Sequence, residues 1–230
     1  MRNNFTEVVC LGDIVGRAPE IFTEPVDPKH TALILIDWQG DPSEPSLHGE
    51  SSIDDKMNAF RATELLLGSA RANDITVIHV VLGCWTRDGR EMELFKQRIN
   101  QQQREAGEDP MPGRWFDAPS RQIVESLRPV KGEIVLQKTS ASAFTTTGLA
   151  ALLHNMKIQY LVFAGRLTEG CLGLTAAEAL SHGFLSTIAE DACNGASRTG
   201  HLVMLRLFDQ HWGRVRSVDE LIEEFEGCRD

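Results

Sequence analysis

Six short apolar runs alternate with helical segments along this chain, and that alternation limits the fold more than any other feature. The runs lie at residues 32–36, 76–82, 133–136, 160–164, 185–188 and 214–217. Several are almost continuous in valine, isoleucine and leucine, as expected of parallel strands buried on both faces. The pattern predicts an α/β fold, a three-layer sandwich with a six-stranded, mostly parallel sheet and helices on both faces.

The segments between the runs carry the signals that begin and end helices. Helices are predicted at residues 53–72, 119–127, 148–155, 171–182, 198–210 and 218–225. Ser52 precedes the first, and Ser217 with Glu220 forms a capping box at the last. Gly183 follows the fourth, where a left-handed stop is expected.

Two stretches do not follow this rhythm. Residues 85–116 are long and polar, which is typical of a lid, a binding loop or an oligomer arm, or else of a mobile insertion. Residues 1–29 are predicted to form an N-terminal arm. The remaining 201 positions, 30–230, are expected to make one domain, a reasonable size for a single core.

Charge and cysteine usage narrow the functional classes. The chain of 230 residues has 23 basic and 33 acidic residues, a net charge of −10, so nucleic acid and anionic membranes are poor partners. Its five cysteines form no Cys-x-x-Cys pair, and no signal peptide or membrane span is evident. We therefore expect a cytoplasmic protein with free thiols.

Reactive side chains follow the predicted strands at the edge where parallel sheets bind ligands. Asp37 follows the first run, Cys84 the second, Lys138 the third and, after the turn 165–170, Cys171 the fourth. A carboxylate, an amine and a thiol converging on one edge suit a cysteine nucleophile, because the carboxylate accepts the thiol proton and the cation favours the thiolate.

Cys171 is the best candidate nucleophile, although a cysteine at a helix start is more often inert packing. It stands where a glycine-rich turn passes into a predicted helix, so helical N–H groups could stabilise a thiolate or an oxyanion. The helix start and Lys138 are expected to lower the pKa of Cys171.

Three motifs in this order resemble the isochorismatase-like cysteine hydrolases. They are Asp37-x-Gln39 after the first strand, Lys138 followed by Ser142-Ala-Phe144, and Gly165-x-x-Thr168-x-x-Cys171. The resemblance covers residues 30–225 and extends to Glu190-Asp-Ala-Cys193 after the fifth strand. The fold that it implies, a parallel sheet flanked by helices, agrees with the alternation of runs.

The resemblance implies a catalytic triad in which Asp37 is the base, Cys171 the nucleophile and Lys138 the cation that positions both. It also implies an oxyanion hole formed by the backbone N–H groups of Leu167 and Cys171, with a cis peptide bond between Arg166 and Leu167. The family members that cleave ureido and carbamoyl amides look most similar. On that analogy four residues contact the substrate: Gln39, Trp85, Phe144 and Thr168.

Two residues of the catalytic turn depart from the family pattern. Arg166 replaces an apolar residue, and Glu169 stands where Asp or Asn is common. No histidine pair has ligand spacing and no Gly-x-Gly-x-x-Gly follows a strand, so we expect neither a metal nor a nucleotide cofactor.

The leading functional hypothesis is an amidohydrolase that cleaves a C–N bond of a small amide, ureido or carbamoyl compound through an acyl-enzyme on Cys171. One alternative is hydrolysis of a vinyl ether, as in isochorismatase itself, which needs no nucleophilic cysteine. Another is a non-catalytic binding protein on the same fold. The resemblance also implies a homo-oligomer, either a dimer or a tetramer.

Overall fold

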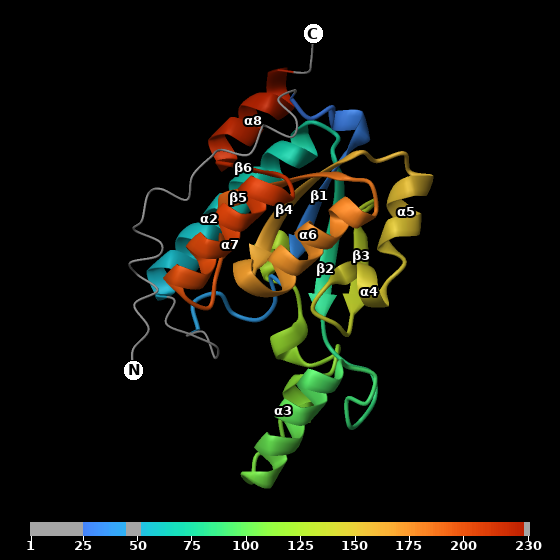
Figure 1. Ribbon diagram of the computed structural model, residues 1–230, viewed down its shortest axis with the longest axis vertical. Helices are drawn as coiled ribbons and strands as arrows, with labels where there is room; N and C mark the ends of the chain where they lie inside the picture. The colour runs from blue at the N-terminus through green and yellow to red at the C-terminus, as the bar shows by residue number, and fades with distance from the viewer. Residues whose placement is uncertain (1–24, 45–51, 228–230) are drawn as a thin grey trace.

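A computed structural model describes residues 25–44 and 52–227 of the chain, and it is built around one parallel sheet (Figure 1). The strands are β1 (Thr31–Ile36), β2 (Thr76–Leu82), β3 (Ile134–Lys138), β4 (Tyr160–Arg166), β5 (Leu185–Asn194) and β6 (Arg214–Arg216). Their order is β3-β2-β1-β4-β5-β6, with every neighbouring pair parallel. The order reverses between β1 and β4, and such a reversal opens a crevice at the carboxyl ends of the two strands.

The two faces of the sheet bury different helices because side chains alternate along each strand. Leu33 and Leu35 of β1 pack against α2 (Ile53–Ala72) and α8 (Val218–Gly227) on one face. The other face of β1 packs against α5 (Leu149–Asn155), α6 (Gly173–Ser181) and α7 (Arg198–His211). The predicted three-layer α/β sandwich is confirmed.

The sequence prediction is wrong at residues 119–127, which are not one helix. Two short 3-10 turns, Pro119–Arg121 and Glu125–Leu127, are separated by extended residues. Ile123 forms a β-bridge with Gln39, so pairing with the loop after β1 overrides the local helical preference.

A second correction concerns β5, which is longer than the apolar run indicated. It extends to Asn194, so Glu190 and Cys193 lie inside the strand rather than after it. Glu190 and Asp191 are exposed, and this polar pair hides the continuation of the strand from a search for apolar runs.

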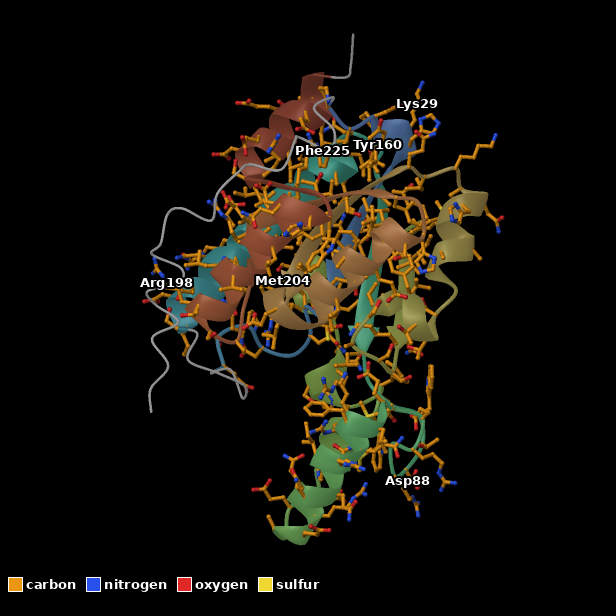
Figure 2. All side chains as sticks on the ribbon, in the orientation of Figure 1. Lys29, Asp88, Tyr160, Arg198, Met204 and Phe225 are labelled. Atoms are coloured by element: carbon orange, nitrogen blue, oxygen red, sulfur yellow. The ribbon has the colours of Figure 1, made fainter. Side chains whose placement is uncertain are left out.

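The insertion at residues 85–116 carries a helix that the polar composition did not indicate. Helix α3 (Leu94–Glu105) projects from the end of the sheet where β2 stops (Figure 1). In Figure 2 its side chains, and those of the loop that bears Asp88, stand out from the body of the molecule. A small separate core of Cys84, Met92 and Met111, with Trp115 against it, holds the base of the insertion.

Most of the predicted N-terminal arm lies outside the described residues. At its described end, Val26 is buried and its N–H donates to Glu224 of α8 at 3.2 Å. None of the helices in residues 25–44 and 52–227 combines the length and the apolar character that crossing a membrane requires.

Candidate active site

Asp37, Lys138 and Cys171 meet at the carboxyl edge of the sheet, where the strand order reverses. Asp37 directly follows β1, Lys138 is the last residue of β3, and Cys171 follows β4 in the turn before α6. The Nζ atom of Lys138 donates to Oδ2 of Asp37 at 3.0 Å. The charges of both residues act on the Cys171 thiol. The structure thus brings the three sequence-predicted residues together.

One carboxylate oxygen of Asp37 accepts a hydrogen bond, and the other does not. Its backbone has φ 54°, an unusual value for a non-glycine residue, and its N–H donates to the carbonyl of Val80 at 2.9 Å. Oδ2 accepts from Lys138, whereas Oδ1 is buried and has no hydrogen-bond partner in the described part of the chain. A buried oxygen without a donor is costly, which marks Oδ1 as a functional acceptor.

Lys138 is completely buried, so its charge has to be balanced locally. Its Nζ donates to Asp37 and to the carbonyl of Ser140 at 3.1 Å. Burial works against the ammonium form, but interactions that include the negative charge of Asp37 and the hydrogen bond to it outweigh burial and raise the pKa of Lys138. The side chain therefore remains a cation and holds Asp37 in place.

The electrostatics of Cys171 correct the sequence-based expectation. Cys171 lies in the turn Thr168–Leu172, which leads directly into α6 (Gly173–Ser181). Gly170 (φ −122°, ψ −117°) interrupts the helical backbone directly before it. Burial, followed by the charge of Asp37, raises the pKa of the thiol to about 11, and Lys138 and Lys96 only partly offset this. At neutral pH the resting residue is a thiol, not a thiolate.

The turn before Cys171 has the backbone that the resemblance implied. The peptide bond between Arg166 and Leu167 is cis. Gly165 has φ 136°, and a Cβ atom there would come within 2.1 Å of the Ile36 carbonyl oxygen. Only glycine allows β4 to approach β1 this closely. The oxyanion-hole role of the Leu167 and Cys171 N–H groups stays a prediction.

Gln39, predicted to contact the substrate, is instead engaged with the backbone. Its Nε2 donates to the carbonyls of Leu82 (3.1 Å) and Arg121 (2.6 Å), and its Oε1 accepts from the Leu82 N–H at 2.8 Å. Both amide hydrogens are therefore used. The side chain ties the loop after β1 to β2 and to the segment that carries Arg121, which is a positioning role.

Two other predicted substrate contacts are buried and already have partners within the protein. Phe144 is 7% exposed and belongs to the core, stacked on His182 with ring centroids 4.6 Å apart. Thr168 is fully buried, and its hydroxyl pairs with Nδ1 of His201 at 2.9 Å. Periodicity cannot separate such residues from pocket-lining ones, because a motif position does not show which way a side chain points.

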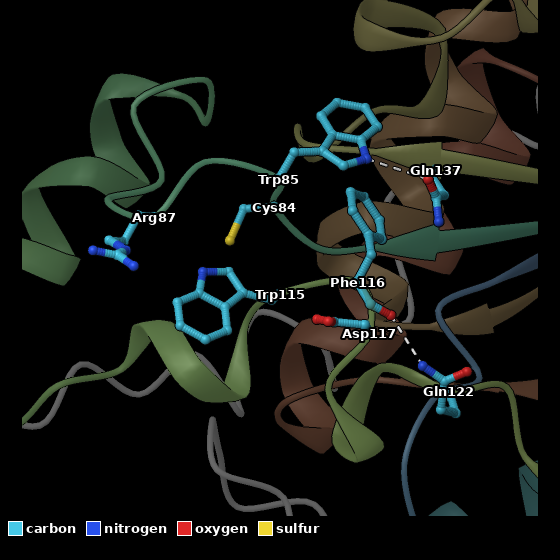
Figure 3. A pocket seen from close by; sticks show the side chains of 8 residues that line it. All are labelled: Cys84, Trp85, Arg87, Trp115, Phe116, Asp117, Gln122 and Gln137. Carbon is cyan, nitrogen blue, oxygen red and sulfur yellow. Dashed lines mark hydrogen bonds between the residues drawn. The ribbon is translucent and has the colours of Figure 1, made fainter.

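Trp85, the fourth predicted contact, does line an open space. It is 59% exposed, lies against Phe116 with ring centroids 4.9 Å apart, and donates its indole N–H to Gln137 at 3.3 Å (Figure 3). A cavity of about 820 Å³ lies here, lined by Cys84, Trp85, Arg87, Trp115, Phe116, Asp117, Gln122 and Gln137. The triad residues are not among its walls, so it borders the insertion rather than the nucleophile.

Glu169 and Arg166, the two residues that depart from the family pattern, both make specific contacts with their neighbours. Glu169 accepts from the Ser197 N–H at the start of α7 at 3.1 Å. Its carboxylate fits because residues 195 and 200 are glycines; a Cβ at either would lie 2.5 Å from a Glu169 oxygen. The Arg166 guanidinium lies over the Trp38 ring, 5.7 Å from its centroid. Both side chains thus brace the turn.

Two cations near the triad were not found by sequence analysis. Lys96 lies on α3, and its positive charge acts to lower the pKa of Cys171. Arg121 interacts electrostatically with Asp37 and Cys171, although burial dominates and lowers its pKa. Neither residue follows a strand, so a search for reactive residues at the ends of strands could not identify them. The one available signal was the length of the insertion that ends shortly before Arg121.

Within the described residues, no group of three or more His, Cys, Asp or Glu side chains is placed to hold a metal ion. His79, the histidine in β2, pairs with Glu133 at 2.9 Å instead. The sequence-based expectation that turnover needs no metal stays a prediction.

Sequence comparison with known protein families gives evidence of common ancestry, in addition to the geometry of the site. The family model of the isochorismatase domain matches residues 31–220. Maleamate amidohydrolase of Pseudomonas putida is 32% identical over 106 residues, 46% of this chain and only half the length of that protein. Ureidoacrylate amidohydrolase of Caulobacter vibrioides is 29% identical over 189 residues, covering 75% of this chain and 80% of that protein.

Solved structures show the same fold. A cysteine hydrolase from Pseudomonas syringae pv. phaseolicola superposes with a TM-score of 0.78 at 19% identity, over 93% of this chain and 100% of that one. An isochorismatase family protein from Desulfovibrio vulgaris superposes with a TM-score of 0.72 at 25% identity, over 84% of this chain and 96% of that one.

Proposed function

Because the chain belongs to the isochorismatase family, we propose that this hydrolase cleaves the C–N bond of a small amide, ureido or carbamoyl compound through an acyl-enzyme on Cys171. The observation that carries the proposal is the free Oδ1 atom of Asp37. It is a buried acceptor without a donor, on a carboxylate whose other oxygen Lys138 holds, and the carboxylate's charge acts on Cys171. Relatives named as amidohydrolases support the same bond type.

The first half-reaction forms a thioester. Asp37 takes the proton of the Cys171 thiol as the sulfur attacks the carbonyl carbon of the substrate. The carbonyl oxygen becomes an oxyanion, which the backbone N–H groups of Leu167 and Cys171 would receive. The C–N bond then breaks, and Asp37 returns the proton to the departing nitrogen.

The second half-reaction restores the thiol. Asp37 accepts a proton from water, whose oxygen attacks the thioester carbonyl carbon. The C–S bond breaks, the acid product leaves, and the proton returns to the sulfur. Lys138 stays protonated throughout and stabilises the negative charge as it passes between carboxylate and sulfur.

The raised pKa of Cys171 fits this order of events. With a pKa of about 11 the resting thiol carries a proton that only a nearby base removes, so nucleophilic attack and proton transfer are coupled. A buried neutral thiol also avoids placing a second negative charge beside Asp37. Activity thus depends on the Asp37 carboxylate rather than on a standing thiolate.

Release of ammonia from a panel of small primary amides and ureido compounds tests the proposal. Cys171→Ala is expected to abolish turnover, while Cys193→Ala, which removes another buried thiol, retains most of it. Mass spectrometry of the wild type, quenched during turnover, should show the acyl group on the peptide that contains Cys171. Full activity in Cys171→Ala would overturn the mechanism, and a binding protein on this fold would release no ammonia from any compound.

A further inference from the structure

Glu169 lies in the catalytic turn, between the cis peptide bond and Cys171, and its carboxylate lies against the start of α7. One oxygen, Oε1, accepts from the Ser197 N–H at 3.1 Å. The other, Oε2, is shielded from solvent and has no hydrogen-bond partner in the described part of the chain. Ser197 is the N-cap of α7, and the start of a helix favours a negative charge. The carboxylate therefore joins the catalytic turn to this helix.

The space that this carboxylate occupies exists because two residues around it are glycines. Gly195 directly follows β5, and Gly200 lies in the first turn of α7. A Cβ at residue 195 would lie 2.5 Å from Oε2, and a Cβ at residue 200 would lie 2.5 Å from Oε1. Neither glycine has a positive φ, so it is the space rather than the backbone that requires glycine. The two glycines thus match the length of the Glu169 side chain.

Two further contacts attach the catalytic turn to α7. The Thr168 hydroxyl pairs with Nδ1 of His201 at 2.9 Å. On the other side of Cys171, Gly173 lies so close to α7 that a Cβ there would collide with the Met204 side chain. Helix α7 therefore supports the turn both before and after the nucleophile.

The turn carries the groups that the proposed reaction uses. The N–H groups of Gly170 and Leu172 both donate to the Leu167 carbonyl, at 2.9 and 3.2 Å. Leu167 and Cys171, whose own N–H groups would receive the oxyanion, stand two residues before and two residues after Glu169. A rotation of the turn at Glu169 would therefore move the thiol and both N–H groups together.

We propose that Glu169 is a positioning residue, whose carboxylate between Gly195 and Gly200 holds Cys171 in the orientation that attack on the substrate requires. The inference rests on the proposed function and adds a determinant of its rate. A displacement of reacting groups by about 1 Å can cost about 100-fold in rate. Because the carboxylate bonds to α7, its loss should lower kcat far more than it raises KM.

Removal of the carboxylate tests this role directly. In Glu169→Ala, kcat for ammonia release from the best compound of the amide and ureido panel should fall about 10- to 100-fold. KM should stay within about threefold of the wild-type value. Glu169→Gln keeps the length of the side chain and an acceptor oxygen for the Ser197 N–H, so it should restore most of kcat. An unchanged kcat in Glu169→Ala, or a rise in KM alone, would overturn the proposal.

Gly200→Ala tests the same contact from the side of α7. The added methyl group would displace the Glu169 carboxylate, so kcat should fall about tenfold or more. A weakened α7 cannot cause this loss, because alanine favours a helix more than glycine does. In the Glu169→Ala background no carboxylate is left to displace, and Gly200→Ala should have no further effect on kcat.

The matched control is Gly68→Ala in α2, because a Cβ at that position meets no atom within 4 Å. It should leave kcat unchanged. If Gly200→Ala lowers kcat equally with and without Glu169, the glycine does not serve the carboxylate and the proposal is wrong.

Hydrogen exchange separates failure of this inference from failure of the proposed chemistry, because it needs no turnover. The Gly170 and Leu172 amides should exchange at least about tenfold faster in Glu169→Ala and Gly200→Ala, measured by mass spectrometry, and at the wild-type rate in Gly68→Ala. Faster exchange in a protein that releases no ammonia would refute the amidohydrolase but support the hold of Glu169 on the turn. Unchanged exchange in both variants would contradict the proposal even if kcat falls.

Discussion

Replacing Asp37 by asparagine should make Cys171 more reactive and at the same time stop catalysis. The change keeps the shape of the side chain but removes its charge and its capacity to accept a proton. Because the charge of Asp37 is the second cause, after burial, of the raised thiol pKa, that pKa should fall. Turnover should stop because no other group takes the thiol proton.

The structure sets the size of the effect. With a pKa of about 11, roughly one Cys171 in a thousand is a thiolate at pH 8. A thiol at the reference value of 9.0 would be about one-tenth thiolate at that pH, so relief of every perturbation would raise the fraction about 100-fold. Burial persists in the variant, so we expect alkylation to accelerate about tenfold, the effect of roughly one pKa unit.

Lys138→Met is the opposing control. The ammonium group of Lys138 lowers the pKa of Cys171, so its removal should slow alkylation below the wild-type rate. Each variant leaves one charge of a buried pair unmatched, which costs about 3–5 kcal/mol of stability. Unfolding would expose the thiol and accelerate alkylation in both variants, so opposite changes cannot result from unfolding.

The assay is alkylation by iodoacetamide between pH 6 and 10, with modification of the Cys171 peptide followed by mass spectrometry. Cys193, whose pKa burial raises to about 12, serves as an unreactive internal standard in the same sample. Ammonia release measures turnover in parallel. Slower alkylation in Asp37→Asn, or retained turnover, would show that Asp37 is neither the charge that raises the pKa nor the base.

Two further predictions concern stability. Burial opposes ionisation of Glu133, but hydrogen bonds from Arg71 and His79 lower its pKa to about 2. Above the unfolded pKa of 4.5, the ionised carboxylate should therefore contribute up to about 3 kcal/mol to the free energy of unfolding. This contribution should be lost as the pH falls towards 2. Urea titrations should show this loss in the wild type and a flatter profile in Glu133→Gln; identical profiles would contradict it. Phe144→Ala should cost about 3–5 kcal/mol in urea unfolding while kcat/KM of the folded enzyme stays within about threefold, because the ring belongs to the core. A large loss of kcat/KM without a loss of stability would return Phe144 to the substrate site.

The fold and the triad could be predicted from sequence because both depend on local order along the chain. Strands buried on two faces need continuous apolar runs, and the carboxyl ends of parallel strands share one edge. Asp37, Lys138 and Cys171 each stand at such an end or just beyond it, so their meeting followed from their positions in the chain. The oligomeric state and the cytoplasmic location stay predictions.

Tertiary structure alone decided the charge state of the nucleophile and the identity of its neighbours. A helix start and a lysine favoured a lowered thiol pKa, but burial and the proximity of Asp37 raise it. Both are properties of packing and distance that a sequence does not state. Lys96 and Arg121 reach the site from the insertion and from a 3-10 turn, across separations that no spacing rule covers. The motifs identified Gln39 and Phe144 but not the direction of their side chains, which packing fixes. The Gln39 amide bonds to the backbone, and the Phe144 ring packs in the core.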